Sequence, residues 1–325
     1  MKIGTLKNNS LDGELVVVSK NLEFYKSASS LAGTMQEAIE KWSDIKSGLE
    51  KIYSDLNSGS CEGAKPFSNS LMHSPLPRAY QWLDGSAYIH HIKLVRKARN
   101  ADLPETLLTV PLMYQGGSDT FLAPTEDIPQ VDFAHGTDFE GEVGVIVKDT
   151  PMGVSPEKAL DHILFFVLIN DVSLRGLIPA ELKMGFGFMQ SKPSSAFSPV
   201  AITPEELGEH YKSGRIHLPL DVKYNDGFFG RANAKEMHFH FGELIAHAAR
   251  TRNLSAGTVI GSGTVSNEDA SMGSSCLAEK RMIEKIETGE FKTPFMKSGD
   301  TVKISMSLPT GENIFGDIAQ KVKSV

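Results

Sequence analysis

The spacing of apolar residues changes along the 325-residue chain, and this change predicts where helices and strands form. The β-branched run at 13–20, GELVVVSK, predicts a short strand. Segment 29–59 carries apolar residues at helical intervals and ends in turn residues, which predicts helix. Segment 70–82, SLMHSPLPRAYQW, contains two prolines and predicts an extended connector. We therefore expect a small N-terminal domain over 1–72 and a larger domain over 73–325.

Beyond the connector, strand patterns dominate. The strand-like runs occupy residues 140–147, 163–170, 218–225, 257–265 and 299–306. Helical patterns lie between them at 156–162, 176–186 and 241–251. The strands are too many and too irregularly spaced for repeated strand–helix units. The pattern predicts an α+β fold that is mainly β, with mixed and mainly antiparallel strands arranged as a sheet roll or sandwich.

Composition narrows the possible partners. The chain is 40% hydrophobic, carries a net charge of −7 and lacks a long basic block, so nucleic acids and anionic membranes are not expected partners. The most apolar run, 163–169, is too short to span a bilayer, and residues 1–20 lack an apolar stretch of the signal-peptide type. The two cysteines, Cys61 and Cys276, suit a reducing compartment. We expect a cytoplasmic protein.

Two glutamates begin a strand that enters the core. In DFEGEV (138–143), Glu140 and Glu142 share the strand face on which Ile146 lies. At about 6.6 Å separation and an effective dielectric of about 20, their repulsion is about 2.5 kcal/mol. Asp171 follows directly after the apolar run 163–170. A hard divalent cation such as Mg²⁺ or Ca²⁺ would explain all three carboxylates. A solvated strand face for the glutamates and a helix N-cap for Asp171 stay open as alternatives.

Further polar residues could complete such a site. Asp84 and His91 lie seven residues apart, and Lys192 follows in a turn-rich segment. Individually each is weak evidence, because isolated Lys and His residues are mostly exposed or structural. The alternation in HFHF would place His238 and His240 on one face of a strand, but without cysteines or an HExxH helix we interpret them as structural. The chain also lacks a GxSxG motif, which disfavours a protein nucleophile.

Taken together, these motifs resemble the fumarylacetoacetate hydrolase family over about Leu71 to Val325. The segments that carry the resemblance are DGSAYIHH, PLMYQGGSD, DFEGEVGVIV, LINDVSLRG, GSGTVSN and GDTVKISM. The resemblance implies a sheet roll of this family's C-terminal type and a homodimer. It also implies cleavage of the C–C bond of a 1,3-diketo acid such as fumarylacetoacetate, to fumarate and acetoacetate, in tyrosine catabolism.

The resemblance also implies a role for each matching position. His91 would be the general base, Glu279 would orient it, and Lys192 would stabilise the oxyanion. The metal, Mg²⁺ or else Ca²⁺ or Mn²⁺, would be held by Asp84, Glu140, Glu142 and Asp171. The substrate would contact Tyr114, Arg175, Thr264 and one further arginine, either Arg96 or Arg99.

The chain also departs from the family's pattern, and this leaves the substrate open. Ser86 stands where the animal member of the fumarylacetoacetate hydrolase family has a substrate-binding tyrosine. The apolar Ile178 and Leu182 occupy two further positions on the substrate side. An acylpyruvase, an oxaloacetate decarboxylase and a 2-oxo-acid isomerase or hydratase are alternatives, as is a non-catalytic metal-binding protein. The presence of both His91 and Glu279 favours hydrolysis, because the alternative reactions can proceed without this pair.

Overall fold

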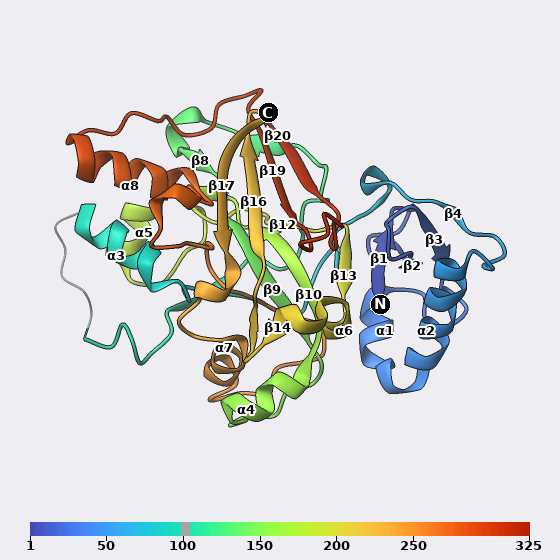
Figure 1. Ribbon diagram of the computed structural model, residues 1–325. Helices are drawn as coiled ribbons and strands as arrows, with labels where there is room; N and C mark the ends of the chain where they lie inside the picture. Colours follow the sequence, from blue (N-terminus) through green and yellow to red (C-terminus); the bar gives the residue numbers. More distant parts are fainter. Residues whose placement is uncertain (99–104) are drawn as a thin grey trace.

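A large β-sheet is the main structural feature of the molecule. The computed structural model describes residues 1–98 and 105–325 (Figure 1). In this part of the chain, eleven strands form one sheet in the order β4-β3-β2-β1-β13-β10-β9-β18-β5-β6, with β12 paired to β10. Its strands are β1 (Lys2–Leu6), β2 (Glu14–Val18), β3 (Phe24–Ser27), β4 (Lys65–Pro66), β5 (Trp82–Gly85), β6 (Met113–Gly116), β9 (Gly141–Val147), β10 (Ile163–Asn170), β12 (Ala196–Phe197), β13 (Val200–Ile202) and β18 (Thr258–Gly261).

A second sheet packs beside the first, with strand order β17-β16-β19-β20-β7. Its strands are β7 (Ile128–Gln130), β16 (Pro219–Tyr224), β17 (Gly227–Asn233), β19 (Thr301–Met306) and β20 (Ile318–Ser324). Short pairs join β8 (Thr137–Asp138) to β11 (Ser173–Leu174) and β14 (Tyr211–Lys212) to β15 (Arg215–Ile216). Only β18–β5 and β20–β7 are parallel among the strand pairs that the structure describes. The predicted α+β, mainly β class with mixed sheets is confirmed.

The helices lie around the sheets. They are α1 (Met35–Glu40), α2 (Trp42–Ser58), α3 (Ile89–Ala98), α4 (Pro156–Ala159), α5 (Ile178–Met184), α6 (Pro204–Leu207), α7 (Phe241–Ala248) and α8 (Leu277–Thr288). Figure 1 shows α3, α5 and α8 together at one side of the molecule, opposite α1 and α2. Within residues 1–98 and 105–325, no helix combines the length and the apolar composition needed to cross a membrane.

The N-terminal segment joins the large sheet directly, because β1 pairs with β13. The helix predicted over 29–59 is in fact two helices, α1 and α2. Thr34 caps α1 by accepting a hydrogen bond from the Glu37 amide, and Gly59 ends α2 in the left-handed conformation. The domain boundary at residue 72 stays a prediction.

Strand β10 passes through the core with both faces covered. Phe166 and Leu168 enter one apolar cluster, whereas Phe165, Val167 and Ile169 enter the cluster on the other face. A strand buried on both faces reads as a continuous apolar run, which is why 163–170 lacks alternation. Its C-terminal end delivers Asp171 to the candidate site.

The first prediction concerns this core strand. Phe166 is fully buried and makes edge contacts with Tyr211 and Phe241. Phe166→Ala should lower the free energy of unfolding by about 3–5 kcal/mol, because it leaves a cavity. Phe228→Ala, which removes a ring that is 69% exposed, should change it by about 0.5 kcal/mol or less. Urea unfolding measures both, and equal shifts of the two midpoints would contradict the assigned burial.

Candidate active site

Three carboxylates carried by or next to three strands lie close together beside a cavity. Asp84 lies in β5, Glu142 in β9, and Asp171 just after β10. Ile169 pairs with Glu142, so alternation directs Glu142 and Asp171 to the same face. The three residues offer oxygen atoms that lie within 4.8 Å of one another. The cavity beside them has a volume of about 470 Å³.

Glu142 is fully buried, and neither of its carboxylate oxygens has a hydrogen-bond partner among the described residues. Burial raises the pKa of Glu142 well above its usual value, and the charges of Asp84 and Asp171 raise it further. Burial and the Asp171 charge likewise raise the pKa of Asp84. Such an arrangement of anions is costly unless a cation compensates it. Asp84, Glu142 and Asp171 therefore form an acidic cluster whose oxygen donors suit a hard divalent ion.

Gly261 provides the space for this cluster. It pairs with Asp84 on one side and with Gly144 on the other. A Cβ atom at position 261 would lie 2.5 Å from Asp84 Oδ1 and 3.0 Å from Glu142 Oε2. A glycine inside a strand often marks such a close approach. A side chain here would push the carboxylates apart.

Lys192 supplies positive charge beside the cluster. Its Nζ donates to Glu140 Oε2 at 2.5 Å and to the carboxylate of Asp171. Burial acts to lower the pKa of Lys192, but the Asp171 and Glu140 charges outweigh it and raise that pKa above its usual value. Lys192 is therefore cationic at neutral pH.

Arg175 ties Glu140 to the start of α8. Its Nε donates to Asp138 Oδ2 at 2.9 Å, and its Nη2 donates to Glu140 Oε1 at 2.7 Å. Asp138 also accepts hydrogen bonds from the amides of Leu277 and Ala278 in the first turn of α8. Burial opposes ionisation of Glu140, but Arg175 and Lys192 hold its pKa well below the usual value. The hydrogen bonds to Asp138 and Glu140 therefore occupy the edge of the Arg175 guanidinium that carries Nε and Nη2.

The predicted substrate contacts Tyr114 and Thr264 both line the cavity. The Tyr114 hydroxyl donates to Asp171 Oδ2 at 2.7 Å, and the Thr264 hydroxyl donates to Glu140 Oε1 at 2.9 Å. Ser195 donates to Asp171 Oδ1 at 2.7 Å. These hydroxyls hold the carboxylates in fixed orientations.

His91 and Glu279 form a pair across two neighbouring helices. His91 Nδ1 lies 2.8 Å from Glu279 Oε2, and Glu279 is 1% exposed. His91 belongs to α3 and Glu279 to the first turn of α8. Cys276 caps α8, since its Sγ accepts the Glu279 amide hydrogen bond at 3.3 Å. The cap and the Asp138 contacts fix the turn that carries Glu279.

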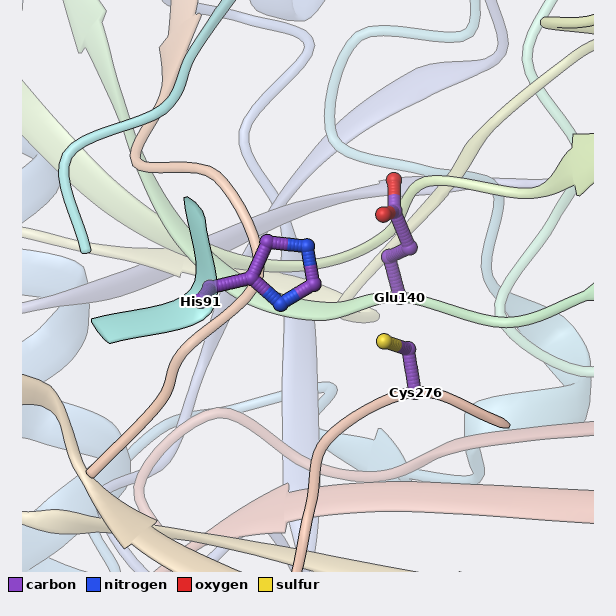
Figure 2. Close-up of side chains that lie close together, drawn as sticks. All are labelled: His91, Glu140 and Cys276. Carbon is purple, nitrogen blue, oxygen red and sulfur yellow. The ribbon is translucent and has the colours of Figure 1, made fainter. Parts of the chain in front are cut away.

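His91, Glu140 and Cys276 form a second group whose potential ligand atoms lie within 4.8 Å of one another. Figure 2 shows the three side chains approaching from separate segments of the chain. The chemistry of this second group disfavours a bound cation. The Glu140 oxygens already accept from Arg175, Thr264, Lys192 and Ser173. Burial and the Asp138 charge raise the pKa of the Cys276 thiol well above its usual value, so it is protonated.

The structure thus brings together ten of the residues proposed from sequence: Asp84, His91, Tyr114, Glu140, Glu142, Asp171, Arg175, Lys192, Thr264 and Glu279. Arg99 and the side chain of Arg96 lie outside the described residues. Ser86, Ile178 and Leu182 line the cavity. The catalytic, metal-binding and substrate-binding roles of these residues stay predictions.

Sequence reasoning missed four supporting residues: Asp138, Ser173, Ser195 and Gly261. Asp138 was detectable, because it precedes Glu140 by the same two-residue step that separates Glu140 from Glu142. Gly261 was detectable as a glycine within a strand pattern. Ser173 and Ser195 gave no signal, since their partners come from other segments.

The fumarylacetoacetate (FAA) hydrolase C-terminal family matches residues 81–323, and the fumarylacetoacetase N-terminal domain 2 family matches residues 1–78. The chain belongs to the fumarylacetoacetate hydrolase family. An oxaloacetate tautomerase of Bacillus subtilis is 23% identical over 246 residues, which cover 74% of this chain and 70% of that protein. A fumarylacetoacetase of Caenorhabditis elegans is 25% identical over 285 residues, which cover 73% and 68%.

Solved structures share the fold. Maleylpyruvate hydrolase from Sphingobium sp. SYK-6 superposes with a TM-score of 0.68 at 16% identity, covering 100% of both chains. The same enzyme in complex with manganese(II) and pyruvate superposes with a TM-score of 0.67 at 16% identity, covering 100% of this chain and 99% of that one.

The second prediction separates the two clusters. Glu142→Gln should weaken Mn²⁺ binding at least about tenfold, because it replaces a charged oxygen donor with a neutral amide. Cys276→Ser should leave the affinity within about threefold, because the thiol is protonated in the second group. Calorimetric titration measures both. A larger loss of affinity for Cys276→Ser than for Glu142→Gln would place the ion in the second group and contradict the assignment to the acidic cluster.

Proposed function

We propose that this protein hydrolyses the C–C bond of a 2,4-dioxo acid or a closely related 1,3-diketo acid, of which fumarylacetoacetate is one. We propose Mg²⁺ or Mn²⁺ as the cofactor, held by Asp84, Glu142 and Asp171 with Glu140 beside them. The products would be a 3-oxo or 2-oxo acid and the acid derived from the acyl group.

The observation that carries this proposal is the hydrogen bond of 2.8 Å between His91 Nδ1 and Glu279 Oε2. His91 lines the same cavity as the carboxylate cluster. A carboxylate that accepts the Nδ1 proton leaves Nε2 as the basic nitrogen and stabilises the imidazolium that forms when Nε2 takes up a proton. A keto–enol isomerisation does not require a base that activates water.

The residues divide the reaction between them. A divalent ion, when bound, polarises the dicarbonyl group and stabilises the enolate that leaves. His91 accepts a proton from water, whose oxygen attacks the carbonyl carbon of the acyl group. The Lys192 ammonium contributes positive charge where the carbonyl oxygen becomes negative. Cleavage of the C–C bond then releases the enolate carbon, which takes the proton from the imidazolium.

Oxaloacetate tautomerisation is the second candidate, because a tautomerase of this substrate is 23% identical to the chain. Tautomerisation moves one proton and breaks no C–C bond. Product analysis therefore separates the two reactions: hydrolysis yields two acids, and tautomerisation yields only an isomer of the starting acid.

The third prediction tests the proposed base. With fumarylacetoacetate or fumarylpyruvate and excess Mg²⁺, His91→Ala should lower kcat by about 10²–10⁴, the usual contribution of a general base. His90→Ala removes the neighbouring imidazole, which is not part of the cavity wall. It should change kcat by less than about twofold. Loss of the diketone absorbance measures the rate, and chromatography identifies the acids formed.

The same two variants show which results would contradict the proposal. Equal losses in His90→Ala and His91→Ala would remove His91 from the chemistry. A wild-type protein that binds Mg²⁺ yet cleaves neither diketone would contradict the proposed reaction, and conversion of oxaloacetate without cleavage would support the tautomerase instead.

A further inference from the structure

The wall of the cavity carries side chains of two kinds. One set is charged and includes the carboxylates, Lys192 and His91. The other set is apolar and comprises Ile178, Leu182, Phe188, Met282, Phe291 and Phe295. The cavity volume of about 470 Å³ lies within the range of about 300–1,000 Å³ that is usual for small-molecule sites.

One cation, Arg281, interrupts the apolar wall. Its guanidinium carbon lies 4.2 Å from the centre of the Phe295 ring and 4.8 Å from that of Phe291. Its Nη1 donates to the backbone oxygen of Thr293. Ala278, Arg281 and Met282 lie three and four residues apart on α8, so they share the helix face that lines the cavity. Contact with two aromatic rings holds a planar guanidinium in a defined orientation.

Arg281 differs from the other two cations in the cavity wall in that no nearby carboxylate among the described residues compensates its charge. Lys192 and Arg175 both form ion pairs with carboxylates inside the site. Arg281 has no carboxylate oxygen within 4.0 Å among residues 1–98 and 105–325. Burial lowers the pKa of Arg281, and the more distant Glu284 and Asp138 only partly offset this. Arginine nevertheless stays cationic at neutral pH, so its charge is available to a bound anion.

We propose that Arg281 binds a second carboxylate of the substrate, at the end of the acyl group, and thereby selects dicarboxylic dioxo acids. This inference rests on the proposed function. The reacting dicarbonyl would lie beside the carboxylates, the carbon chain would pass the apolar side chains, and the far carboxylate would reach the guanidinium. An arginine presents several donors to a carboxylate, and bonds between charged partners are the stronger ones.

A matched pair of substrates tests the proposal. Fumarylpyruvate and crotonylpyruvate share one carbon skeleton and differ only in a terminal carboxylate or methyl group. The wild-type protein should prefer fumarylpyruvate in kcat/KM by at least about tenfold. Arg281→Gln should abolish the preference by raising KM for fumarylpyruvate, and should change kcat/KM for crotonylpyruvate by less than about threefold. Arg281→Lys should restore part of the preference.

Lys280→Gln is the control, because it removes a charge from the adjacent position of the same helix. Lys280 lies over Phe229, 5.4 Å from the ring centre, and is not part of the cavity wall. This variant should keep the wild-type preference. Equal losses for both substrates in Arg281→Gln, or an unchanged preference, would overturn the proposal.

Binding measurements separate this proposal from the proposed reaction. In the His91→Ala background, fumarylpyruvate should bind at least about tenfold more tightly than crotonylpyruvate, and the further change Arg281→Gln should remove the difference. Selective binding without turnover in the wild type would contradict the hydrolase and uphold the role of Arg281. Turnover of both substrates without selectivity would do the reverse.

Discussion

The burial of carboxylates at the ends of core strands is the constraint on which this structure depends. Glu142 and Asp171 are fully buried, and Asp84 is nearly so. Removing such charges from water costs several kcal/mol per ion unless partners compensate. The protein supplies Lys192 and hydroxyl donors for Asp171 but leaves both Glu142 oxygens without a donor among the described residues. That imbalance identifies where a cation would stabilise the molecule.

The same network reaches the proposed base. Arg175 connects Glu140 to Asp138, and Asp138 accepts the amides that open α8. The first turn of α8 carries Glu279, which contacts His91. Charge compensation around Glu140 therefore also positions the pair that would activate water. The following turn of α8 carries Arg281, which also lines the cavity. One helix thus contributes to both ends of the proposed substrate site.

Local patterns in the sequence predicted the parts of this site that depend on alternation. The step from Glu140 to Glu142 and the position of Asp171 after an apolar run both follow strand geometry. The residues alone offered His91 and Lys192 as candidates, whereas the resemblance supplied Glu279 and the roles of all three. The helical segment expected over 29–59 contains two helices. The spacing of apolar residues did not reveal that a new helix begins at Trp42. The rings around Arg281 come from a later segment of the chain, so no local pattern indicates them.

The most direct test of the account is the position of a bound ion. Crystals of the protein soaked with Mn²⁺ would be measured at a wavelength where manganese scatters anomalously. The account predicts an anomalous peak among the carboxylates of Asp84, Glu142 and Asp171. A peak between His91, Glu140 and Cys276, or no peak in crystals that contain Mn²⁺ at saturating concentration, would contradict it.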